Sequence, residues 1–272
     1  MHLLAVDIGN SNINLGLFDG TALRASRRAT TRVTSTSDEL AAQVAGLLAL
    51  DGLEWTDVGS SALASVVPPL TEPFARVLEQ HTGVPPTIID AASLDGILSI
   101  DIDRPAEAGA DRLANALAAG AEYGGPAIVV DLGTSTNFDV VDAGGAYIGG
   151  AIAPGLALSL EALVGSASKL PRIELRRPER AIGSNTISAM QSGTVNGCIG
   201  LVSGLLAALR GELVERSPAG ARVTVIATGG LASQPWLEGV PGIDHVDPTL
   251  TLRGIRLAAE RIGARAGAAA AR

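Results

Sequence analysis

The stretch "VVDLGTSTNFDVVDAGG", residues 129–145, decides the fold, because a similar stretch, "AVDIGNSNINLGLFDGT", occupies residues 5–21. When the two are aligned, Asp131 falls on Asp7, and the glycine two positions later falls on its counterpart. Each copy reads as an apolar strand, an Asp-x-Gly turn rich in hydroxyl and amide side chains, and a second strand. We therefore predict a chain of two similar α/β halves.

The composition is that of a globular protein. The 272 residues are 47% hydrophobic and 18% charged, which is enough apolar sequence to bury a full core. The net charge of −8 repels phosphate backbones, so we expect no nucleic-acid partner. The single cysteine, Cys198, excludes a disulfide framework and a multi-cysteine zinc site.

The N-terminus predicts a cytoplasmic protein. The first residues, "MHLLAVDIGN", contain no basic region and reach Asp7 too early for a signal peptide. We expect no apolar run close to the length of about 18 residues that spans a bilayer, and hence no membrane partner.

Several kinds of active site are excluded by what the sequence lacks. His2, His81 and His245 are scattered, with no ligands at metal-binding spacing. The chain has no G-x-S-x-G nucleophile elbow and no G-x-G-x-x-G dinucleotide motif. Its only lysine, Lys169, does not belong to a G-x-x-x-x-G-K loop, which excludes P-loop chemistry.

Hydrophobic spacing predicts the remaining elements of the first half. Thr36 and Glu39 form a capping box before a helix, and Gly83 ends a second helix that begins at "PPL". A third helix begins near Gly109–Asp111 and ends around Gly124. The expected strands are residues 3–8, 13–18, 61–67 and 86–90.

In the second half, the Gly/Pro-rich segment 147–155 is expected to be a loop, and residues 186–216 a long helix. Residues 222–230 predict a strand that ends in Thr228-Gly229-Gly230 and is followed by a helix. The segment "LRGIRLAAERIG" closes the fold. The boundary lies near residues 118–126, which gives halves of 1–118 and 119–272.

The long helix carries glycines along one face. Each interior glycine costs roughly 1 kcal/mol relative to alanine, so a row of them predicts close approach of another helix. The alternative is a sequence that is merely rich in Gly and Ala. The glycines are Gly193, Gly197, Gly200, Gly204 and Gly211.

The repeated turn has the chemistry of a phosphate site. Glycine leaves room for an oxygen-rich group to approach the backbone, and successive N–H groups form an anion nest. Asp7 or Asp131 can hold a cation directly or through water. Two such turns facing each other across a cleft would hold a polyphosphate, with Gly229-Gly230 under a base. The short donors are Asn10, Ser11, Asn12, Thr134, Ser135 and Thr136.

These features resemble the actin/sugar-kinase/Hsp70 ATPase superfamily, and within it the type III pantothenate kinases. The motifs that carry the resemblance, from residue 3 to about residue 260, are "DIGNSN", "SVVPPLT", "GADR", "DLGTST", "GGAIAPG", "IGSNT", "QSG" and "ATGGLA". The resemblance implies two ribonuclease H-like halves, each a mixed sheet flanked by helices, with a cleft between them. It implies ATP-dependent phosphorylation of pantothenate, the first step of coenzyme A biosynthesis, by a homodimer.

The resemblance also implies residue roles. The first ATP phosphate loop is Asp7, Ile8, Gly9, Asn10, Ser11, Asn12, Ile13 and Asn14, and the second is Gly133, Thr134 and Ser135, with Gly229 and Gly230 at the nucleotide. Asp131 binds a monovalent cation, K⁺ or NH₄⁺, and Asp7 binds Mg²⁺ through water. Pantothenate is held by Gly109, Ala110, Asp111 and Arg112, with Thr186 of a partner subunit, and Asp111 accepts the proton of the attacking hydroxyl.

The chemistry of Asp111 and Arg112 agrees with these roles. A carboxylate in the first turn of a helix is kept ionised by the helix dipole and accepts a proton as the transition state forms. Arg112 suits the carboxylate of pantothenate. The alternatives are that Asp111 only caps the helix, that Arg112 is a solvated charge, and that Thr186 is an ordinary helix N-cap.

Two positions depart from the family pattern. Ile102 stands where the family usually has a Tyr that contacts pantothenate, so the acceptor pocket has lost a hydroxyl donor. Asn137 replaces a usual Thr but still donates and accepts hydrogen bonds.

Three functions follow as hypotheses. The first is a pantothenate kinase. The second is a related kinase for another small hydroxylated substrate, with Ile102 as its mark. The third is a non-catalytic regulatory protein on the same fold, against which the intact Asp7, Asp111 and Asp131 argue.

Overall fold

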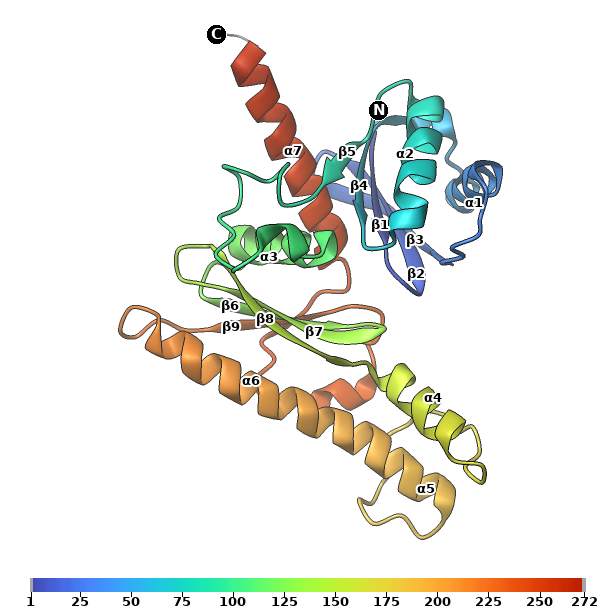
Figure 1. Cartoon of the computed structure of the whole chain (residues 1–272), viewed down its shortest axis with the longest axis vertical. Helices are drawn as coiled ribbons and strands as arrows, with labels where there is room; N and C mark the ends of the chain where they lie inside the picture. Colours follow the sequence, from blue (N-terminus) through green and yellow to red (C-terminus); the bar gives the residue numbers. More distant parts are fainter. Residues whose placement is uncertain (1, 271–272) are drawn as a thin grey trace. The chain divides into compact units, whose positions relative to one another are not determined.

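The computed structural model describes residues 2–270, which form two compact units (Figure 1). The first unit contains the residues up to Ala118 together with the helix that begins at Leu250. The second unit contains Ala119–Thr249. The sequence-based division assigned residues 119–272 to the second half, whereas the structure groups the last helix with the first unit.

The first unit is built on a five-stranded mixed sheet in the order β3-β2-β1-β4-β5. The first three strands form an antiparallel meander, and β4 and β5 continue parallel to β1. The strands are β1 (His2–Ile8), β2 (Asn12–Asp19), β3 (Ala22–Thr30), β4 (Val58–Ser65) and β5 (Thr87–Ile89).

Helices cover both faces of this sheet. Leu4, Val6 and Ile8 of β1 belong to an apolar core shared with α1 (Ser37–Ala49) and α2 (Pro68–Thr82). On the other face lies α7 (Leu250–Ala270), because its Leu252 packs near Gly16 of β2 and its Arg256 lies over the Phe18 ring. The remaining elements are α3 (Ala110–Glu122), η1 (Trp55–Asp57) and η2 (Pro105–Glu107).

Packing against β1 explains why α7 belongs to the first unit. Leu250, Leu252 and Ile255 are buried, and α7 contacts β1, β4 and β5. Gly254 allows the helix to lie directly against the Ala114 carbonyl of α3. Sequence spacing shows that α7 is amphipathic but not which sheet its apolar face covers.

Two predicted helix ends are confirmed. Thr36 and Glu39 form the reciprocal capping box of α1, with the Thr36 Oγ1 accepting from the Glu39 N–H at 3.3 Å. Gly83 ends α2 with φ of +73°, a left-handed conformation that glycine adopts without steric cost.

The second unit repeats the sheet of the first, in the order β10-β9-β6-β7-β8. Again three antiparallel strands are followed by two strands parallel to the central one, so the predicted pair of similar halves is confirmed. The strands are β6 (Ala127–Leu132), β7 (Ser135–Val141), β8 (Tyr147–Pro154), β9 (Thr224–Thr228) and β10 (His245–Val246).

One face of the second sheet packs on a long helix. Ile128, Val130 and Leu132 of β6 form an apolar core with residues of α6 (Gly197–Glu215). The chain enters α6 through α5 (Thr186–Gln191) and the π turn η3 (Ser192–Asn196), which confirms the predicted long helix. The other elements are α4 (Leu156–Ser166) and η4 (Pro235–Gly239).

The expectation that no apolar run is long enough to cross a membrane is wrong for this helix. Thr186–Glu215 passes the test of length and hydropathy, and 22% of its most apolar window is buried in the chain. One such helix is weak support for a membrane span, because the test considers length and composition alone.

Three other segments differ from the prediction. Residues 147–154, expected to be a loop, form β8, because the backbone pairs with β7 despite the glycines. The helix expected after Gly230 is only a turn and the short η4, since Pro235 starts a single 3₁₀ turn and Gly239 ends it. The third is β3, which was not predicted, because polar residues interrupt its sequence and none of its residues is buried.

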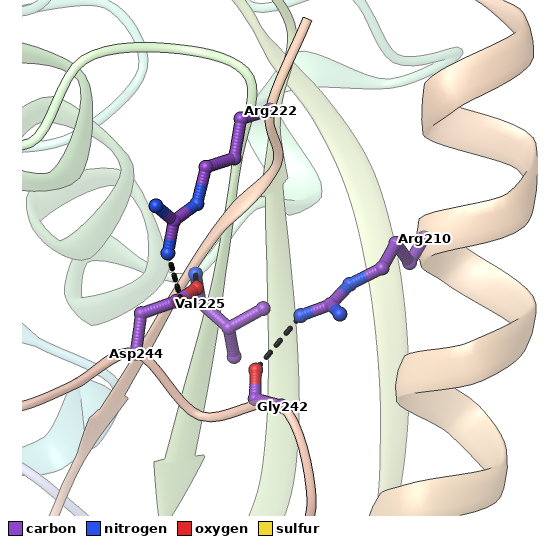
Figure 2. A network of polar contacts seen from close by, with 5 residues as sticks. All are labelled: Arg210, Arg222, Val225, Gly242 and Asp244. Carbon is purple, nitrogen blue, oxygen red and sulfur yellow. Dashed lines mark hydrogen bonds and ion pairs between the residues drawn. The ribbon is translucent and has the colours of Figure 1, made fainter.

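Side chains secure the segment that returns to β9, as Figure 2 shows. The Asp244 carboxylate accepts from the Val225 backbone N–H at 2.9 Å and from Arg222 at 2.8 Å. Arg210 of α6 donates to the Gly242 carbonyl at 2.7 Å. The segment before β10 is thereby held to both β9 and α6.

Candidate functional site

The first repeated turn joins β1 to β2 and is closed by backbone hydrogen bonds. The Gly9 N–H donates to the Asn12 carbonyl at 3.0 Å, and the Thr31 hydroxyl donates to the Gly9 carbonyl at 2.6 Å. Asn10, Ser11 and Asn12 are exposed at the tip, where their polar groups are available to a ligand. The turn is therefore a rigid loop with exposed donors.

The two isoleucines of the predicted phosphate loop lie elsewhere. Ile8 and Ile13 are fully buried in the core of the first unit. Their side chains hold β1 and β2 in the core, and these two strands fix the position of the loop between them. Thr31, which sequence reasoning missed, braces the loop from the end of β3, and nothing in the local sequence around Thr31 signals this long-range contact.

Asp7, one residue before the end of β1, is a buried carboxylate with 9% of its surface exposed. The Asn14 amide, directly opposite on β2, donates to its Oδ2 at 2.9 Å. The pKa of Asp7 is raised to about 7, mainly by burial and to a smaller extent by the negative charge of Asp111. The hydrogen bond from Asn14 lowers the pKa, but it offsets only part of this increase. The site thus contains a second carboxylate, Asp111, close enough for its charge to raise the pKa of Asp7.

Asp111 lies in the first turn of α3, as predicted. Its Oδ1 accepts from the Arg112 backbone N–H at 2.8 Å. Burial raises the pKa of Asp111, against the lowering effects of that bond and of the Arg112 charge. Gly109 gives the carboxylate its room, since a β-carbon at position 109 would come 2.5 Å from Oδ1 and 3.3 Å from Val66.

Asp7 and Asp111 therefore meet within the first unit. Val66, which follows β4, donates its N–H to the Ile8 carbonyl at 3.0 Å, so the carboxyl ends of β1 and β4 lie together beside the start of α3. Ligands of open α/β sheets bind beyond the carboxyl ends of the strands. The geometry matches a site for a charged, oxygen-rich ligand.

The second repeated turn joins β6 to β7 in the second unit. The Gly133 N–H donates to the Ser135 carbonyl at 2.9 Å, the same closure as in the first turn. The Gly155 N–H donates to the Thr134 carbonyl at 3.1 Å, which ties the turn to the start of α4. The Thr134 side chain is exposed.

Asp131, at the end of β6, lies beside the Gly229 turn. A β-carbon at position 229 would overlap Asp131 Oδ1, and the Leu231 N–H donates to the Leu132 carbonyl at 3.1 Å. Gly229 and Gly230 are thus next to the second turn. Among residues 2–270 no group of three or more His, Cys, Asp and Glu side chains gathers to hold a metal.

Two other predicted substrate residues lie outside α3. Ile102 is half-buried in the loop before η2. Thr186 is exposed at the first position of α5, and the N-cap is Asn185, whose Oδ1 accepts from the Ser188 N–H at 2.9 Å. The alternative that Thr186 is merely the N-cap is therefore wrong.

Thr186 lines an apolar groove of about 720 Å³ in the second unit. The other residues of the groove come from the end of β8, from α4 and the segment after it, and from the long helix. They include Pro154, Leu163, Met190, Cys198 and Leu201.

Comparison with known proteins gives consistent results. Residues 3–208 match the family model of the type III pantothenate kinases. A type III pantothenate kinase of Rhodospirillum centenum is 45% identical over 97% of this chain and 100% of its own length. One of Moorella thermoacetica is 43% identical over 95% and 99%.

Solved structures give the fold alone. A Campylobacter jejuni protein described as a Baf family transcriptional activator has a TM-score of 0.57 at 17% identity, covering 95% of this chain and 98% of its own. An activator of 2-hydroxyisocaproyl-CoA dehydratase from Clostridium difficile has a TM-score of 0.52 at 13% identity, covering 98% and 97%.

Proposed function

The chain belongs to the type III pantothenate kinase family, which phosphorylates pantothenate with ATP in coenzyme A biosynthesis, and from this premise we propose which residues perform the reaction. Of the three functions inferred from the sequence, the first is the one that the names of the relatives support. A kinase of this kind needs a base for the attacking hydroxyl, groups that hold ATP and groups that hold the acceptor.

Asp111 is the proposed general base. The pantothenate hydroxyl oxygen forms a bond to the γ-phosphorus of ATP, the bond from that phosphorus to the bridging oxygen breaks, and ADP leaves. The hydroxyl proton passes to the Asp111 carboxylate. Support comes from the place of Asp111 in the first turn of α3, with Oδ1 oriented by the Arg112 N–H at 2.8 Å.

Both repeated turns are proposed to hold ATP. Their exposed polar side chains and their closed backbone shape support a role in phosphate binding. Ile8 and Ile13 act by anchoring the first turn. The proposed residues are Asp7, Gly9, Asn10, Ser11, Asn12 and Asn14 in the first unit, and Gly133, Thr134, Ser135, Gly229 and Gly230 in the second.

The acceptor is proposed to bind at the start of α3. Gly109 leaves room there for the Asp111 carboxylate, Ala110 completes the proposed substrate segment, and the Arg112 guanidinium pairs with the carboxylate of pantothenate. Ile102 lines the pocket from the preceding loop. Thr186 contributes from a second copy of the chain.

Two cations are proposed, and the donors present fit both. The buried oxygens of Asp7, next to Asp111, suit a hydrated Mg²⁺, and Asp131 suits K⁺ or NH₄⁺. When bound, these ions neutralise charge on the phosphates of ATP.

The experiment that tests this function measures ADP release with ATP, Mg²⁺ and K⁺, with and without pantothenate. Asp111→Asn is expected to lower kcat by about 10²- to 10⁴-fold. Asp38→Asn is the matched control, because Asp38 is an exposed acid in the first turn of α1. ADP release that does not depend on pantothenate, or that survives in Asp111→Asn, would contradict the proposal.

The half-buried Ile102 favours a second candidate, a kinase for another small alcohol. Ile102→Tyr restores the hydroxyl donor that the family usually has. If pantothenate is the acceptor, the variant should keep or lower the KM for pantothenate. If the pocket instead binds a different substrate, wild type should phosphorylate another alcohol faster than pantothenate. Ile102→Tyr should then phosphorylate pantothenate faster than that alcohol.

We also propose a homodimer in the cytoplasm, without nucleic acid or membrane. A β-carbon at any of the five glycines along the long helix would meet no described atom within 4 Å beyond its chain neighbours and the nearby backbone of the helix itself. Apolar side chains near that helix are also exposed, so the surface suits a second copy of the helix. These side chains are Leu158, Leu163 and Ile187.

Light scattering of the purified protein without detergent tests the dimer. Gly200→Arg is expected to give monomers, since it improves helix propensity while obstructing close approach. Gly267→Arg on α7 is the control, because that position is also open. A monomeric wild type, or a dimer that survives Gly200→Arg, would contradict this assignment.

A further inference from the structure

Three polar residues form one row across the sheet of the second unit. Asp131 on β6 is paired directly with Asn137 on β7 and with Thr228 on β9. Directly paired residues of neighbouring strands project to the same face, with strands about 4.8 Å apart. The three side chains therefore stand side by side on one face of the sheet.

This face is not the one that packs on α6. Val130 and Leu132, which flank Asp131 on β6, belong to the apolar core beneath that helix. Successive side chains of a strand alternate between faces. The row of Asp131, Asn137 and Thr228 thus lies on the opposite face, near the carboxyl ends of β6 and β9.

Two oxygens of this row are buried without a hydrogen-bond partner among the described residues. They are Oδ1 of Asn137 and Oγ1 of Thr228, and the Thr228 side chain is fully buried. Buried polar atoms without a partner are rare in folded proteins because their desolvation is uncompensated. Two of them beside one carboxylate indicate a ligand that coordinates oxygen.

The charge of the row selects the kind of ligand. One carboxylate and two neutral oxygens carry a single negative charge, which matches one positive charge. Calcium sites in proteins commonly draw on several carboxylates, whereas neutral oxygens suffice to replace the hydration shell of K⁺.

We propose that Asn137 Oδ1 and Thr228 Oγ1 join Asp131 as ligands of a monovalent cation, and that this chain uses an amide oxygen where the family usually has a threonine hydroxyl. The inference rests on the proposed cation role of Asp131 and adds two ligands to it. Thr228 acts from β9, so the cation also ties the Gly229 turn to β6.

Thermal unfolding at constant ionic strength, with KCl replacing tetramethylammonium chloride, tests the ligand set without turnover. A bound cation raises the midpoint as its concentration rises. The measured quantity is the K⁺ concentration that gives half of the maximal increase in the midpoint. Asn137→Leu and Thr228→Val are each expected to raise this concentration by about tenfold or more. Asp131→Asn should abolish the increase.

Two variants serve as controls. Thr224→Val makes the same change four residues earlier on β9, beside Ala127 rather than Asp131, and should respond to K⁺ as wild type does. Asn137→Thr keeps an oxygen and should lose less than Asn137→Leu. Each variant is measured with and without a non-hydrolysable ATP analogue.

The outcomes separate this inference from the kinase function. A wild-type response in both Asn137→Leu and Thr228→Val, or no K⁺ response in wild type under either condition, overturns the ligand set. Pantothenate-dependent ADP release is measured separately. If ADP release did not depend on pantothenate, the proposed function would be contradicted. The ligand set would still be supported if K⁺ stabilised wild type but not the Asn137→Leu and Thr228→Val variants.

Discussion

Gly229 lies so close to Asp131 that a β-carbon at position 229 would overlap the Asp131 carboxylate and come 2.7 Å from the Leu132 backbone nitrogen. Gly229 also has φ of +91°, a conformation that other L-residues rarely adopt. The turn after β9 and the carboxylate at the end of β6 are therefore built against each other, and a larger residue would displace one of them.

Gly229→Ala should both destabilise the protein and weaken nucleotide binding. Strain in φ accounts for about 1–2 kcal/mol, and the overlap adds to it. Gly220→Ala isolates the strain, because Gly220 has φ of +84° with nothing within 4 Å. Urea unfolding and titration with an ATP analogue measure the two effects, and equal losses in both variants would contradict the role of the Asp131 contact.

Gly254→Ala should detach α7 from α3. A β-carbon at position 254 would overlap the Ala114 carbonyl, so we expect a loss of about 1–3 kcal/mol in the free energy of unfolding. Gly263→Ala on the same helix meets nothing within 4 Å and should stabilise by about 0.5–1 kcal/mol through helix propensity. Urea unfolding compares them, and a neutral Gly254→Ala would show that the helices are not in close contact.

The Asp244 carboxylate should make stability depend on pH. Desolvation raises its pKa, but the bonds from the Val225 N–H and Arg222 outweigh this and hold the pKa below its usual range (Figure 2). A depressed folded-state pKa stabilises the protein above the unfolded value of about 3.9, and this contribution disappears as the pH falls through the folded pKa.

Asp244→Asn should accordingly cost about 1–2 kcal/mol at pH 7 and progressively less below about pH 4. Unfolding of both proteins across pH 2–7 gives the difference. Asp19→Asn is the control, since Asp19 pairs with Arg24 at an exposed site. A difference that grows as the pH falls would have the wrong sign.

The Cys198 thiol reports on the proposed dimer. Burial raises the pKa of this thiol, so little thiolate is present at pH 7 and labelling by a disulfide reagent should be slow, accelerating toward alkaline pH. Cys198 lines the apolar groove, so the rate should also fall as the protein concentration rises. A rate independent of concentration, in wild type and in Gly200→Arg alike, would contradict burial of the groove by a second copy.

Local signals in the sequence were enough for the repeated elements. The Asp-x-Gly turns, the Thr36 capping box and the left-handed Gly83 each depend on residues a few positions apart, so their physics can be read directly. The same holds for Asp111 in the first turn of its helix. The same strand–turn–strand pattern occurs in both halves, so the sequence also predicted that the two halves would form similar sheets.

Other features depend on residues far apart in the chain. The sequence contains Asn137, Asp131 and Thr228, but only strand register brings them into one row. Only packing decides that α7 covers the sheet of the first unit, or that a segment as rich in glycine as β8 becomes a strand. Local conformational preference is a property of neighbouring residues, whereas register and packing are chosen by the free energy of the whole fold.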